Sequence, residues 1–125
     1  MKIARVDHLV LTVASLKATC DFYSQVLGME VVETPKRPTA LFFGQQKINL
    51  HEAGHEFQPK ARKPTVGAGD FCLITEDSMA DWLAHLDRLK VEIELGPVPR
   101  SGALGPMTSI YLRDPDYNLV EIACY

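Results

Sequence analysis

The stretch DHLVLT at residues 7–12 decides the fold, because DFCLIT at residues 70–75 begins the same pattern again. Both stretches are short and mostly apolar, as buried strands are. Each is followed by a serine that can cap a helix, Ser15 in the first half and Ser78 in the second. The sequence therefore predicts one structural unit that occurs twice along the chain.

Each half predicts the order strand-helix-strand-strand-strand, which gives an α+β protein of two tandem βαβββ modules. Within one domain, we expect module one at residues 1–53, a linker at 54–69 and module two at 70–125. The expected strands of module one are residues 3–13, 29–34, 39–43 and 47–52, and its helix ends at Gly28. The expected strands of module two are residues 70–75, 91–95, 108–112 and 118–124, with a Gly/Pro-rich loop at 98–106.

The composition excludes several classes of partner. The chain has 125 residues, 46% of them hydrophobic, and a net charge of −3. This charge predicts no nucleic-acid partner and no membrane partner, because both require clustered Lys and Arg. There is no apolar run long enough for a transmembrane helix and no pattern of a signal peptide, so we expect a cytoplasmic protein. Cys20, Cys72 and Cys124 are widely spaced, which indicates reduced and mostly buried thiols.

The repeat also predicts a metal site. Two related modules packed about a pseudo-twofold axis bring their first strands and their last strands to a common centre. Aligning residues 7–12 with 70–75, and 48–51 with 118–121, places four residues at that centre: His8, His51, Phe71 and Glu121. Imidazole and carboxylate suit zinc, iron, nickel, manganese or cobalt, and three protein ligands leave room for water or substrate. We therefore predict one divalent metal ion held by His8, His51 and Glu121.

The same segments resemble a known superfamily. DHLVLTV at residues 7–13, DFY at 21–23 and VLGM at 26–29 are similar to the opening module of the vicinal oxygen chelate superfamily. This group contains glyoxalases, bleomycin-resistance proteins and extradiol dioxygenases. The ending YLRDPDYNLVE at residues 111–121 resembles its closing strand-turn-strand.

The resemblance implies a cupped, mixed or antiparallel sheet around a metal, and a small substrate that chelates the metal through adjacent oxygens. It also implies a homodimer. The superfamily's ligand positions map onto the same four residues, and Phe71 departs from the histidine usual at its position. The resemblance thus implies a site of three ligands, in which Glu121 or a metal-bound hydroxide moves a proton.

Three activities remain open within this group. The first is a glyoxalase-like lyase or isomerase, although Thr12 replaces an arginine that helps bacterial glyoxalase I to hold glutathione. The second is Fe(II)-dependent extradiol cleavage of a catechol, for which two His and one carboxylate are the usual ligands. The closing segment matches that signature only in part, because Tyr117 stands where Gly or Pro is expected. The third is a drug-binding resistance protein without catalysis, which usually lacks the three ligands.

Overall fold

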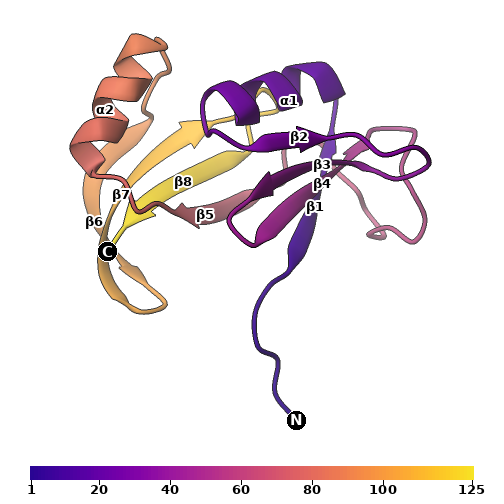
Figure 1. Cartoon of the computed structure of the whole chain (residues 1–125), viewed down its shortest axis with the longest axis horizontal. Helices are drawn as coiled ribbons and strands as arrows, with labels where there is room; N and C mark the ends of the chain where they lie inside the picture. Colours follow the sequence, from indigo (N-terminus) through magenta and orange to yellow (C-terminus); the bar gives the residue numbers. More distant parts are fainter. The chain divides into compact units, whose positions relative to one another are not determined.

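A computed structural model describes all residues, 1–125, as two compact units, Met1–Ala68 and Gly69–Tyr125. Each unit consists of one helix and one four-stranded sheet, whose elements are labelled in Figure 1. The first unit contains β1 (His8–Val13), α1 (Leu16–Gln25), β2 (Glu30–Val32), β3 (Thr39–Phe43) and β4 (Gln46–Glu52). The second contains β5 (Asp70–Ile74), α2 (Met79–Arg88), β6 (Leu95–Gly102), β7 (Gly105–Arg113) and β8 (Leu119–Cys124).

The two sheets have the same topology, with orders β1-β4-β3-β2 and β5-β8-β7-β6. In each, the first and last strands of the unit pair in parallel and the remaining pairs are antiparallel. The expected fold class, α+β with two βαβββ modules, is confirmed. Neither helix is long and apolar enough to cross a membrane.

Local sequence determines where the helices begin and end. The hydroxyls of Ser15 and Ser78 accept hydrogen bonds from the backbone N–H groups of Ala18 and Asp81, so both predicted N-caps are confirmed. Gly28 follows α1 with a φ of 68° and donates its N–H to the Ser24 carbonyl. This left-handed conformation is the one that a glycine C-cap provides.

Each unit buries the alternate residues of its sheet together with apolar residues of its helix. In the first unit, Leu41, Ile48 and Tyr23 are 0% exposed, and in the second Ile110, Val120 and Leu86 are 0% exposed. The other face of each sheet carries polar residues that include His8, Asn49 and Glu121, because successive side chains of a strand point to opposite faces.

One predicted element is wrong. The expected strand at residues 91–95 is absent except for its last residue, and β6 instead runs through the segment expected to be a loop, Leu95–Gly102. The sequence did not predict this strand because it contains two prolines, and a proline nitrogen cannot donate a hydrogen bond to a neighbouring strand. β6 pairs only with β7 and is an edge strand, where proline is tolerated, and the register shifts between Leu95 and Val98.

The predicted alignment of the two halves is also wrong in detail. The backbone N–H of Lys47 donates to the Asp7 carbonyl, and that of Leu119 donates to the Gly69 carbonyl, at the same place in each parallel pair. His8 is opposite Lys47 and Asp70 is opposite Leu119. His8 is therefore equivalent to Asp70 rather than to Phe71, and Asn49 rather than His51 is equivalent to Glu121.

Candidate functional site

The two predicted histidine ligands lie on one face of the first sheet. Cross-strand partners share a face, so His8 lies beside Lys47, and His51 lies beside Thr12. We call the surface of His8, Lys47, Asn49 and His51 the histidine face. His8 and His51 are offset by four residues along parallel strands, about 13 Å at ~3.3 Å per residue. Asn49 is offset from His8 by two residues only, which makes it the nearer of the two possible partners.

His8 presents one ring nitrogen outward. Its Nδ1 lies 2.8 Å from the Asp7 carboxylate, and its side chain is 44% exposed. The hydrogen bond from His8 is the main reason why the pKa of Asp7 is lowered. Adjacent residues of an extended chain point to opposite faces, but the Asp7 carboxylate nevertheless reaches the imidazole. Nε2 is therefore the nitrogen of His8 that can bind an ion.

His51 has a different environment. It is buried, with 4% of its surface exposed, and its ring lies 5.7 Å from the ring of Phe57, centroid to centroid. Phe57 belongs to the segment expected to be a linker that could cover a site. The contact shows that this segment folds back onto His51 within the first unit.

Glu121 lies at the centre of the equivalent surface in the second unit. It is directly opposite Cys72 on one side and Tyr111 on the other. We call the surface of Asp70, Cys72, Tyr111 and Glu121 the glutamate face. Arg100 donates from Nε to the Tyr111 hydroxyl at 2.9 Å, and its guanidinium lies 5.4 Å from the centre of the Tyr111 ring. A carboxylate, a thiol and a phenol thus form one row across the sheet.

The Cys72 thiol stays protonated at neutral pH. Burial, then the Glu121 charge, then a hydrogen bond with Glu121 raise the pKa of Cys72 to about 11. The side chain nevertheless belongs to an exposed residue, so the expectation of a buried thiol is wrong for Cys72. Partial burial and the neighbouring Glu121 carboxylate together therefore make this thiol a weak nucleophile.

Three buried oxygens on these sides of the sheets have no hydrogen-bond partner: Asn49 Oδ1, Glu121 Oε1 and Ser109 Oγ, which lies two residues before Tyr111 on β7. Asn49 and Glu121 occupy equivalent positions in the two units, each between two buried aliphatic residues of its strand. Buried polar atoms are rarely left unpaired, so each of these oxygens can accept a hydrogen bond or bind an ion within its own unit. The sequence contained a signal for this equivalence, since Ile48-Asn49-Leu50 and Val120-Glu121-Ile122 each place a polar residue between two aliphatic ones. The prediction missed it because it aligned His51, rather than Asn49, with Glu121.

No three His, Cys, Asp or Glu side chains come together in the structure. Of the predicted ligands, the first unit supplies His8 and His51, and the second supplies Glu121. Phe71, the fourth position of the predicted centre, points away from the glutamate face, because it is adjacent to both Asp70 and Cys72 along β5.

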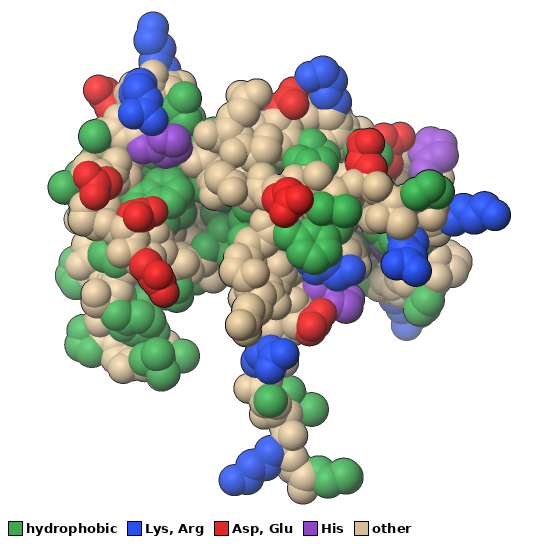
Figure 2. All heavy atoms as spheres, in the orientation of Figure 1, with side chains coloured by type: hydrophobic (Ala, Val, Ile, Leu, Met, Phe, Trp, Pro, Cys, Tyr) green, Lys and Arg blue, Asp and Glu red, His purple; other side chains and the backbone are tan.

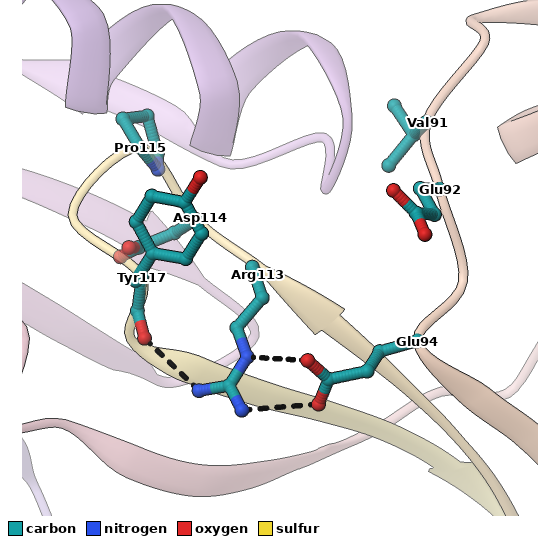
Figure 3. Close-up of a pocket in the computed structure, with 7 residues that line it drawn as sticks. All are labelled: Val91, Glu92, Glu94, Arg113, Asp114, Pro115 and Tyr117. Atoms are coloured by element: carbon teal, nitrogen blue, oxygen red, sulfur yellow. Dashed lines mark hydrogen bonds and ion pairs between the residues drawn. The ribbon is translucent and has the colours of Figure 1, made fainter.

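A cavity of about 380 Å³ opens in the second unit beside the turn after β7. The Arg113 guanidinium in its wall donates hydrogen bonds to both carboxylate oxygens of Glu94, each at 3.0 Å, and to the Tyr117 carbonyl (Figure 3). An unpaired guanidinium could bind an anionic substrate. Because Glu94 already neutralises it, Arg113 stabilises this loop rather than offering a free positive charge.

A second cavity, of about 290 Å³, lies in the first unit and is lined by Asp7, Phe42 and Lys47 among others. The Lys47 ammonium lies 5.8 Å from the centre of the Phe42 ring. Since Lys47 is opposite His8, this cavity borders the histidine face.

The sequence matches the Glyoxalase/Bleomycin resistance protein/Dioxygenase superfamily over residues 5–122. The chain belongs to this superfamily. It is 47% identical over 125 residues to the glyoxalase domain-containing protein RDO1 of Mycosarcoma maydis, covering all of the chain and 70% of that protein. It is 48% identical to the virulence protein STM3117 of Salmonella typhimurium, covering 100% of the chain and 87% of that protein.

Solved structures agree with this assignment. The crystal structure of STM3117 superposes with a TM-score of 0.97, covering 100% of this chain and 99% of that one. A lactoylglutathione lyase from Agrobacterium tumefaciens superposes with a TM-score of 0.76 at 25% identity, covering 99% of this chain and 96% of that one. The names of the two relatives at nearly half identity do not specify a reaction, so the chemistry must be argued from the residues.

Proposed function

We propose that this protein is a metal-dependent enzyme with glyoxalase-like lyase or isomerase chemistry on a small substrate that binds through two adjacent oxygens. The observation that carries the proposal is the pair of unpartnered buried oxygens, Asn49 Oδ1 and Glu121 Oε1, at equivalent positions of the two units. A fold without a ligand at these positions would leave both desolvation penalties uncompensated.

The donor set fits a divalent ion such as zinc, nickel, manganese, cobalt or iron. His8 would bind through Nε2, Glu121 through Oε1, and His51 as the third predicted ligand, with Asn49 as an oxygen donor closer to His8 along the strands. Bound there, the ion would supply Lewis acidity that polarises the two substrate oxygens.

The protein's own groups would carry the rest of the chemistry. Glu121 is the candidate for moving a proton, because it is an acceptor already desolvated and it faces the thiol of Cys72 and the phenol of Tyr111. Tyr111 accepts a hydrogen bond from Arg100, which leaves its own proton for a substrate oxygen. Thr12 lies beside His51 in place of an arginine, so we propose a substrate other than a glutathione conjugate.

A second candidate, extradiol cleavage of a catechol with Fe(II), is favoured by the position of Tyr111. This residue belongs to the closing segment that partly matches the dioxygenase pattern, and it lies directly across from Glu121. We also propose a homodimer, as the superfamily resemblance implies, and a cytoplasmic location, as the sequence pattern predicts. A drug-binding protein without catalysis is the third candidate, and it would not require a metal.

The proposal is tested by metal analysis of the purified protein, followed by Co²⁺ titration after dialysis against a chelator. We expect one ion per chain, and its loss in His8→Ala and Glu121→Gln, while His51→Ala tests the third predicted ligand. His85→Ala is the matched control, because His85 lies on α2 beside Trp82 and outside both faces. Turnover of a 2-oxoaldehyde adduct, such as the hemithioacetal of methylglyoxal with a thiol other than glutathione, would support the lyase. Oxygen-dependent ring opening of catechol alone would replace it with the second candidate, and a protein that binds no metal would overturn both.

A further inference from the structure

The Asp7 carboxylate has no role in building the fold. The backbone carbonyl of Asp7 accepts from Lys47 N–H, which continues the β1–β4 ladder. The equivalent residue in the second unit is Gly69, whose carbonyl makes the same contact with Leu119 N–H. Since a residue without a side chain serves the same position equally well, the ladder requires only the backbone of Asp7.

The Asp7 carboxylate instead forms a hydrogen bond with the imidazole of the next residue, His8. Its Oδ1 lies 2.8 Å from His8 Nδ1, although both side chains are well exposed, 72% for Asp7 and 44% for His8. Arg5 and Lys47 are close enough to influence the carboxylate electrostatically, but neither forms an ion pair with it within 4.0 Å. The imidazole of His8 is thus the specific partner of the Asp7 carboxylate.

We propose that Asp7 is a positioning residue that holds His8 in the tautomer with the proton on Nδ1, so that the lone pair of Nε2 is presented to the metal. This rests on the proposed function, because it assumes that His8 binds an ion. The hydrogen bond of one ring nitrogen decides which tautomer is present and which nitrogen remains free to coordinate. The second unit agrees with this role. Asp70, at the position equivalent to His8, has no imidazole tautomer to fix, and it is preceded by Gly69, which has no side chain.

The test separates the orientation of His8 from metal binding. In the metal-free protein labelled with ¹⁵N-histidine, the ring nitrogen shifts of neutral His8 report which nitrogen carries the proton. We expect the Nδ1–H tautomer in the unaltered protein and in Asp7→Asn, whose amide oxygen can still accept. We expect a shift toward Nε2–H in Asp7→Ala. An unchanged tautomer in Asp7→Ala would overturn the proposal.

The same variants are then titrated with Co²⁺. We expect Asp7→Ala to weaken binding about 10-fold to 100-fold, the usual effect of losing such a partner, and Asp7→Asn to weaken it less. Asp21→Ala is the matched control, because Asp21 is an exposed carboxylate paired with Lys17 on α1. Equal affinity in Asp7→Ala and Asp21→Ala would refute the role of Asp7. If the unaltered protein bound no Co²⁺ while its tautomer still depended on Asp7, the proposed function would fail and the orientation of His8 would stand.

Discussion

The histidine face of the first unit and the glutamate face of the second are built on the same strand register but present different chemistry. At the two matched positions, the first unit has His8 and Asn49 and the second has Asp70 and Glu121. Both units have an unpartnered buried oxygen at the second of these positions. The comparison teaches that the duplicated backbone repeats the same positions on each sheet, and that the side chains of each copy decide which chemistry stands there.

The largest effect is expected from removing the charge of Glu121, because the first unit has the uncharged Asn49 at the equivalent position. Glu121→Gln keeps the size of the side chain but loses the anion, so Co²⁺ affinity should fall by more than ~100-fold. The measurement is direct titration of the dialysed protein, with circular dichroism to show that the fold is retained. If Glu121→Gln retained its Co²⁺ affinity, the Glu121 charge would not contribute to metal binding, and the two faces would not be alike in function.

The comparison can be sharpened by making the first unit resemble the second. Asn49→Asp places a carboxylate at the position equivalent to Glu121, so metal affinity should rise about 10-fold, whereas Asn49→Ala should lower it. His51→Ala in the same titration decides whether the buried imidazole beside Phe57 is also a ligand. If neither Asn49 variant changes the affinity, the equivalence of Asn49 and Glu121 has no bearing on the metal.

Much of this comparison could be predicted from the sequence. The capping serines, Gly28 and the alternation in β4 and β8 are local signals, and they gave the two modules correctly. The register was missed, because a shift by two residues keeps every side chain on the same face and leaves the apolar pattern unchanged. For β5, the shift was one residue, which moved Phe71 to the wrong face. β6 was missed because its prolines are tolerated only at an edge, and an edge is a tertiary property.

A smaller effect concerns the thiol that has no counterpart in the first unit, where Val10 occupies its position. Because the pKa of Cys72 is raised to about 11, its thiolate should be scarce below that pH, and alkylation at pH 8 should be slow despite exposure. Glu121→Gln removes one cause of the shift, so the pKa should fall and alkylation should become several-fold faster. Mass spectrometry of the metal-free protein measures it, with Cys72→Ser to identify the site. An equal rate in both forms would show that Glu121 does not act on the thiol.

The smallest effect compares the two helix caps. Ser15→Ala and Ser78→Ala should each lower the free energy of unfolding by about 1 kcal/mol, because each leaves an N–H at a helix start without its acceptor. The loss should be larger for Ser78, whose hydroxyl also donates to the Asp81 carboxylate at 2.8 Å. Urea denaturation of both variants gives the difference, and a larger loss at Ser15 would contradict this account.

The most direct test of the central claim is the number of Co²⁺ ions bound per chain, measured side by side for the unaltered protein, Glu121→Gln and His85→Ala. We predict one tightly bound ion in the unaltered protein and in His85→Ala, and its loss in Glu121→Gln. Tight binding that survives Glu121→Gln, or no binding in any of the three proteins, would contradict a metal centre built on Glu121.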